Sequence, residues 1–215
     1  MHCAARWFRA TFALVIVLAP VPCLAETTGA IVRDSAYAQV LRTINPRLAN
    51  GESRVYATAL VADSVRMRLD PRLVMAVVTV ESGWNARAIS PAGAEGLGQF
   101  TPETARTLGI DAWSGRSNLR GVTLYLHRLL GMFSSSRNAM REALASYNVG
   151  PYTIKSNGGV APRGALHYVA KVLATFHAFE SRLSAQPTVA VATALAPPDA
   201  AQSVAQDEAA YWGVR

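Results

Sequence analysis

Glu81 lies at a change in sequence character that suits acid–base chemistry. It directly follows the apolar run 73–80, and a polar, glycine-rich stretch extends from Gly83 to Gly98. Burial beside apolar side chains disfavours the ionised form of a carboxyl group, so we expect the pKa of Glu81 to rise toward neutral pH. One raised carboxylic acid beside a polar groove is best matched to cleavage of a glycosidic bond.

A second catalytic carboxylate, which ordinary glycosidases need, is not evident near Glu81. Glu95 lies among glycines, where an exposed loop is expected. Glu103 follows Thr101-Pro102 at the expected start of a helix, where the helix dipole favours a negative charge. The sequence therefore offers a single carboxyl group, Glu81, which can suffice if the substrate brings its own nucleophile.

Metal, cofactor and nucleic-acid functions find no support in the sequence. The histidines of the expected helices, His127, His167 and His177, are not spaced to share a metal ion with Asp, Glu or Cys. No phosphate-binding loop, nucleophile elbow or nucleic-acid motif is present. We therefore expect no metal, no cofactor and no nucleic-acid partner.

The elements that must position Glu81 are predicted to be helices. Asp70-Pro71 and Thr101-Pro102 each combine a capping side chain with proline at the first helical position. Asn50 is expected to cap an earlier helix, and Gly150-Pro151 to end a later one. No alternating strand pattern is evident, which predicts an all-α fold, with β structure at most marginal. The predicted helices cover about 50–68, 71–82, a short segment from 102, 118–133, 137–147 and 164–183.

Both ends of the chain differ from this middle part. Residues 1–25 have two arginines, then an apolar stretch too short to span a bilayer, as in a cleaved secretory signal peptide. Residues 184–215 are rich in Ala, Val, Pro, Gln and Ser, which predicts a disordered tail. Removal of residues 1–25 would lower the net charge from +7 to +5 and remove both cysteines. We expect an exported, periplasmic or secreted protein without stable membrane insertion.

Several separated blocks, in the right order, resemble one known family. The segments 81–105, 145–151 and 165–173 are similar to the soluble lytic transglycosylases, which cleave peptidoglycan and have a lysozyme-like fold. The resemblance covers roughly residues 65–176. It implies a single lysozyme-like domain of about six or more helices, which we place at residues 26–183.

The resemblance also assigns roles to individual residues. Glu81 matches the family's catalytic acid/base. Tyr168 matches an aromatic hydroxyl that points toward this carboxyl group. Ser90 and Gln99 match polar groups that line the groove, and Tyr147 and Asn148 match the pair that contacts the sugar on the far wall.

Three features at the expected site leave alternatives open. Trp84 suits either a sugar platform or core packing under the loop. Gly98 stands where the family commonly has Met, which is expected to remove a side chain from the groove floor. Ser146 replaces a residue that is often Ala. The departures at Gly98 and Ser146 affect fine specificity rather than the acid itself.

The resemblance implies an exported peptidoglycan lytic transglycosylase. Such an enzyme cleaves the β-1,4 bond between N-acetylmuramic acid and N-acetylglucosamine and leaves a 1,6-anhydro sugar end. The expected partner is the peptidoglycan glycan strand, for wall remodelling or for an envelope secretion or conjugation machine, and the protein is expected to be a monomer. A lysozyme-type hydrolase and a peptidoglycan-binding assembly factor with weak activity remain the alternatives.

Overall fold

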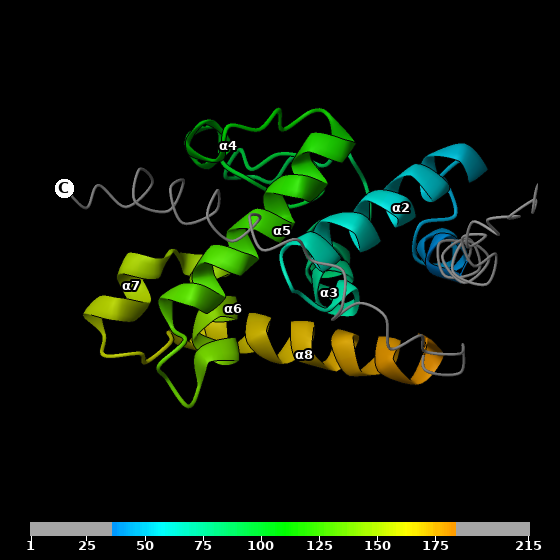
Figure 1. Cartoon of the computed structure of the whole chain (residues 1–215). Coiled ribbons are helices and arrows are strands. Elements are labelled where there is room, and N and C mark those ends of the chain that lie inside the picture. The colour runs from blue at the N-terminus through cyan, green and yellow to red at the C-terminus, as the bar shows by residue number, and fades with distance from the viewer. Residues whose placement is uncertain (1–35, 184–215) are drawn as a thin grey trace, which may run out of the picture.

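The computed structural model describes residues 36–183 of the 215-residue chain, and nearly all of its regular structure is helical (Figure 1). Residues 36–44 are helical and precede α2. Within the described residues, the only β structure is two isolated bridges, Ile89 with Glu95 and Glu95 with Phe100. The predicted all-α class is confirmed. The remaining helices are α2 (Asn50–Arg66), α3 (Pro71–Ser82), α4 (Pro102–Leu108), α5 (Gly115–Met132), α6 (Ala139–Val149), α7 (Pro151–Ser156) and α8 (Arg163–Leu183).

Helix α3 lies at the centre of the domain, with α2, α5 and α8 packed against it (Figure 1). Its residues Val74 to Val78 are completely buried, and Leu73 is 2% exposed. A helix that is apolar on all sides is stable in water only when other elements surround it. This burial explains the uninterrupted apolar run before Glu81 and fixes the helix that carries the acid.

The predicted helix starts at Asp70 and Thr101 are confirmed by their capping bonds. The Asp70 side chain accepts a hydrogen bond of 2.8 Å from the backbone N–H of Arg72. The Thr101 hydroxyl accepts one of 3.2 Å from the N–H of Thr104. In each case proline occupies the first turn, where its missing N–H needs no partner.

Other helix boundaries differ from the sequence-based prediction. Ala49, not Asn50, is the N-cap of α2, and its side chain makes no capping bond. α5 begins at Gly115, because the hydroxyl of Ser114 caps the helix by accepting from Ser117 N–H. The helical segment 36–44 and α7 were not predicted. α7 begins with Pro151, so the proline that ends α6 also starts the next helix.

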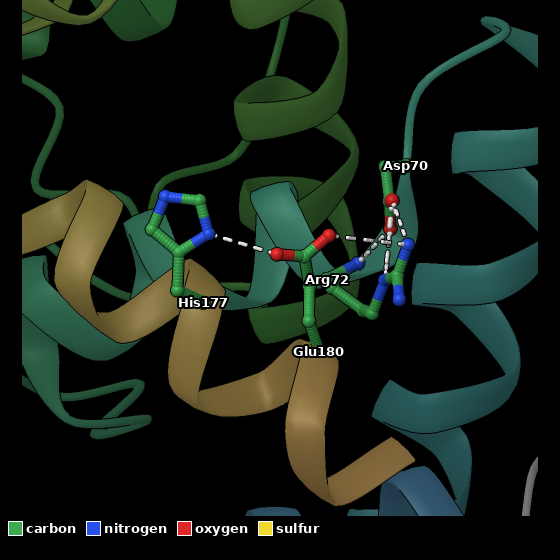
Figure 2. Close-up of polar contacts among 4 residues, drawn as sticks. All are labelled: Asp70, Arg72, His177 and Glu180. Atoms are coloured by element: carbon green, nitrogen blue, oxygen red, sulfur yellow. Dashed lines mark hydrogen bonds and ion pairs between the residues drawn. The ribbon is translucent and has the colours of Figure 1, made fainter. Parts of the chain in front are cut away.

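A polar cluster joins the start of α3 to the end of α8 (Figure 2). Arg72 Nη2 lies 2.6 Å from Asp70 Oδ2 and 3.9 Å from Glu180 Oε1. Glu180 also accepts a 2.8 Å contact from His177 Nδ1. The Arg72 guanidinium lies 5.8 Å from the centre of the Phe176 ring. These contacts are partly exposed, so each is expected to contribute little to the stability of the fold.

The predicted signal peptide, residues 1–25, and the predicted tail, residues 184–215, lie outside the described residues. Among residues 36–183, no helix combines the length and the apolar character that a bilayer crossing requires.

Candidate active site

Glu81 lies in the last turn of α3 at the edge of the core. Gly83 ends the helix in the left-handed conformation, with φ of 56°, which glycine adopts without a steric penalty. The Ser82 hydroxyl then donates a 2.8 Å hydrogen bond to the carbonyl oxygen of Leu97. The helix end that carries the acid is therefore tied to the loop that follows it.

Burial raises the pKa of Glu81 from 4.5 to about 7. Two effects oppose burial and favour the ionised form: a hydrogen bond from Tyr168 and the positive charge of Lys171. Burial is the largest effect, because a carboxylate loses hydration in an apolar environment. At neutral pH a substantial fraction of Glu81 is therefore protonated and able to act as a general acid.

Tyr168 and Glu81 are in direct contact, as the sequence analysis predicted. Tyr168 lies on α8 and is 9% exposed, and its hydroxyl donates a hydrogen bond of 2.6 Å to Glu81 Oε1. Burial, followed by the charge of Glu81, raises the pKa of Tyr168 well above its usual value. The tyrosine therefore stays protonated and remains a hydrogen-bond donor to the carboxyl group.

Tyr147 shares the electrostatic environment of Glu81 from a third helix, α6. Burial raises its pKa, and the charge of Glu81 is the second cause. Its hydroxyl donates a 3.0 Å hydrogen bond to the carbonyl oxygen of Gly98. Its ring lies 5.3 Å from the ring of Tyr125 and 5.9 Å from that of Phe100. Tyr147 therefore fixes the loop beside the acid.

Gly98 is a point of close approach rather than a gap in the floor of the site. A β-carbon built at this position would clash with Val122 and would lie 2.8 Å from Phe100 Cε2 and 2.9 Å from the Tyr147 hydroxyl. The residue is buried, and its N–H donates a 2.7 Å bond to Asn118 Oδ1. Val122, Phe100 and Tyr147 therefore occupy the space that a side chain at position 98 would need.

Asn118 organises this loop, a role that the sequence analysis missed. Its side chain is fully buried, and Nδ2 donates to the carbonyl oxygens of Ala112 at 2.9 Å and Glu95 at 3.2 Å. Together with the bond to Gly98, these contacts use both ends of the amide. One feature of the sequence could have indicated this role: Asn118 is a polar residue that directly precedes Leu119, the first residue of the apolar face of the predicted helix.

Ser90 and Gln99 also act within the loop. The Ser90 hydroxyl oxygen accepts a 3.0 Å bond from Ala94 N–H. Gln99 Nε2 donates to the carbonyl oxygens of Gly96 at 2.9 Å and Ala88 at 3.2 Å. Gln99 has φ of 51°, a conformation that is strained for a residue with a side chain. These bonds hold the loop in shape, and neither residue makes a hydrogen bond to Glu81.

The remaining candidates divide between surface and core. Asn148 is exposed in the last turn of α6. Trp84 is completely buried, packs 6.1 Å from the ring of Tyr56 and donates from Nε1 to Thr79 Oγ1 at 3.1 Å. A sugar-platform role for Trp84 is therefore wrong. Ser146, on α6, is fully buried as well.

Glu95 and Glu103, the other two acids of this region, are not among the groups that interact with Glu81. Glu103 lies in the first turn of α4, as predicted, and is exposed. Glu95 is half-buried rather than exposed, and its backbone pairs with Ile89 and Phe100. The causes that set the pKa of Glu81 include no second carboxylate.

Within residues 36–183, no three potential ligands among His, Cys, Asp and Glu are grouped to hold a metal ion.

Comparison with known proteins gives a consistent family match. Residues 60–165 match the family model described as the transglycosylase SLT domain. The chain is 33% identical over 144 residues to a transglycosylase of Enterobacteria phage PRD1, covering 66% of this chain and 50% of that protein. It is 40% identical over 85 residues to membrane-bound lytic murein transglycosylase F of Vibrio cholerae, covering 38% of this chain and 16% of that protein.

A solved structure shares the fold. An inactive Glu-to-Gln variant of the lytic transglycosylase Slt from Pseudomonas aeruginosa superposes with a TM-score of 0.51 and 21% sequence identity. The match covers 74% of this chain and 31% of the other. The chain thus spans about half the length of the phage relative and a smaller part of the larger proteins.

Proposed function

The chain carries a transglycosylase SLT domain and belongs to the soluble lytic transglycosylase family, and we propose that it cleaves peptidoglycan glycan strands with Glu81 as the single acid/base. The proposed bond is the β-1,4 linkage between N-acetylmuramic acid and N-acetylglucosamine. The proposed product carries a 1,6-anhydro-muramic end.

The observation that carries this proposal is the state of the Glu81 carboxyl group. Burial raises its pKa to about 7, and the Tyr168 hydroxyl holds it at 2.6 Å. A carboxylic acid with a pKa near the working pH can both give and take back a proton within one reaction. The Glu-to-Gln change in the inactive Pseudomonas aeruginosa variant agrees with a catalytic Glu in this fold.

The reaction needs one carboxyl group because the substrate supplies the nucleophile. Glu81 protonates the glycosidic oxygen, and the bond from this oxygen to C1 of the muramic sugar breaks. The N-acetyl group of that sugar stabilises the positive charge at C1. Glu81, now ionised, removes the proton from the C6 hydroxyl of the same sugar, and the C6 oxygen forms the new bond to C1. No water is consumed, and Glu81 ends protonated.

The surrounding residues have supporting roles in this proposal. Tyr168 orients the acid, and Tyr147 holds the loop through Gly98. Ser90 and Gln99 keep the loop in the shape that receives the sugar. Asn148, which is exposed beside Tyr147, contacts the sugar directly.

The cellular setting follows from the same substrate. Peptidoglycan lies outside the cytoplasmic membrane, so residues 1–25 are proposed to export the protein to the periplasm or the medium. Residues 26–183 form the catalytic domain, which works as a monomer without a cofactor. Residues 184–215 are a tail outside that domain. Wall remodelling, or opening the wall for an envelope secretion or conjugation machine, is the proposed process.

Product analysis tests the proposal. Purified sacculi are digested with the protein, and the released muropeptides are weighed by mass spectrometry. Anhydro ends, one water lighter than reducing ends, support the proposed reaction. Reducing ends would identify a lysozyme-type hydrolase. Binding to sacculi without release of fragments would identify a peptidoglycan-binding assembly factor.

A further inference from the structure

Lys171 lies one helical turn after Tyr168 on α8. Residues three apart on a helix lie on the same face, so Lys171 is a neighbour of Tyr168, whose hydroxyl donates a hydrogen bond to Glu81. α8 packs directly on α3, the helix that carries the acid. Lys171 itself is exposed. The geometry therefore places an exposed cation within one helical turn of the tyrosine that is bonded to Glu81.

The charge of Lys171 reaches Glu81 without forming an ion pair with it. It favours the ionised form of the acid and so opposes the effect of burial on the pKa of Glu81. The other titratable groups that interact with Glu81 are Tyr168 from α8 and Tyr147 from α6. Within residues 36–183, the ion pairs of α3 and α8 involve Arg72, His177 and Glu180 but not Lys171. Its ammonium group is therefore available to a ligand.

The other lysine of the chain provides an internal comparison. Lys155 lies in the last turn of α7, is exposed, and is not among the groups that act on Glu81. All other basic side chains, apart from histidine, are arginines. A lysine ammonium is a compact charge on a flexible stem, so it can follow one carboxylate without needing two-point geometry.

Resting on the proposed function, we propose that Lys171 binds a carboxylate of the glycan substrate next to the bond that Glu81 cleaves. Two carboxylates have this chemistry: the lactyl group of a peptide-free muramic sugar and the carboxylates of the stem peptide. In either case Lys171 would give the enzyme a preference for anionic strands over neutral ones.

The test compares four proteins: wild type, Lys171→Met, Lys171→Arg and the control Lys155→Met. Methionine keeps an unbranched side chain of nearly the same length and removes the charge. Each protein is assayed on peptide-free strands, on strands with stems, and on both after amidation of the carboxylates. Exposed ion pairs are weak and are screened by salt, so we expect Lys171→Met to raise KM roughly three- to fivefold on an anionic strand.

The expected pattern has three further parts. The increase in KM disappears on amidated strands and at high salt, Lys171→Arg retains most of the wild-type affinity, and Lys155→Met behaves as wild type. The anionic strand that shows the effect identifies the source of the carboxylate. An equal change on amidated strands, or a changed pH profile with no change in KM, would overturn the proposal, since Lys171 would then act only through Glu81.

A binding measurement separates this inference from the proposed function. In the Glu81→Gln background no turnover is needed, and the affinity for anionic and amidated strands is measured by calorimetry with and without Lys171→Met. Loss of affinity only for anionic strands supports the Lys171 site even if the wild type fails to cleave. Equal affinities, or no binding of any strand, would overturn the Lys171 site whatever the wild type does to sacculi.

Discussion

The hydroxyl of Tyr168 donates a 2.6 Å hydrogen bond to Oε1 of Glu81 and joins α8 to the last turn of α3 across 87 positions of the sequence. The bond stabilises the ionised carboxylate, whereas burial destabilises it more strongly. The pKa of Glu81 near 7 is thus a balance between a buried helix end and a hydroxyl group on another helix.

Tyr168→Phe is expected to move the pH profile of cleavage to higher pH. The change keeps the ring and removes the donor that lowers the pKa of Glu81, so the alkaline limb of kcat/KM, expected near pH 7, should rise. The rate should also fall roughly tenfold, because a hydrogen bond to a charged group is lost. Tyr152→Phe, at a tyrosine that is 83% exposed, serves as the control. An unchanged alkaline limb would remove Tyr168 from the account of the acid.

Glu81→Gln is expected to stabilise the protein above pH 7 and to have little effect near pH 4. The folded-state pKa, about 7, lies above the ordinary value of 4.5, so the folded protein holds this proton more tightly than the unfolded chain. This contribution to stability is complete below pH 4.5 and is lost as the pH rises through 7. The gain at pH 8.5 should be on the order of 3 kcal/mol. Urea unfolding at both pH values measures it.

Glu103→Gln is the matched control for this comparison, because Glu103 is exposed in the first turn of α4. It should show no comparable gain at pH 8.5. Equal effects of Glu81→Gln at the two pH values would contradict the raised pKa.

Gly98→Ala is expected to destabilise the fold by roughly 1–3 kcal/mol, because the added methyl group overpacks the contact of Gly98 with Val122, Phe100 and Tyr147. Gly51→Ala is the control. Gly51 lies in α2, and a β-carbon added there would have nothing within 4 Å. Alanine at this position should therefore be neutral or stabilising. Thermal unfolding of the two variants decides the point. A Gly98→Ala protein as stable as wild type would show that the loop moves freely.

The caps at Asp70 and Thr101 and the raised pKa of Glu81 could be predicted from sequence, because each depends on neighbours in the chain. Asp70-Pro71 gave the start of α3, and the apolar run before Glu81 gave its raised pKa. The same proline rule, applied to Pro151, would have given α7. The local sequence was sufficient to predict these features, because a helix start and the burial of a helix end depend mainly on residues nearby in the chain.

The interior of the loop could not be predicted in this way. Asn118 bonds to Gly98 from 20 positions away, and Gln99 bonds to Ala88 from 11 positions away. Trp84 is equally compatible with surface and core until the position of Tyr56 is known. These roles depend on which helices meet, and a single sequence carries no direct record of that.

Removal of residues 184–215 is expected to leave folding and cleavage unchanged. Every proposed site residue lies between Glu81 and Lys171, and the tail sequence has too little regular apolar content to extend the core. The chains 26–183 and 26–215 should melt within about 2 °C of each other, since a difference of 1 kcal/mol would shift Tm by several degrees. A larger drop, or lost digestion of sacculi, would place the domain boundary after residue 183.

Release of anhydro-muropeptides from sacculi by the Glu81→Gln protein tests the central claim most directly. The amide is nearly isosteric with the acid but cannot donate a proton and take it back, so release should fall by ~10²–10⁴-fold or more while the protein stays folded. Glu103→Gln should release fragments at the wild-type rate. Anhydro products formed by folded Glu81→Gln at a rate close to wild type would contradict the assignment of Glu81 as the acid/base.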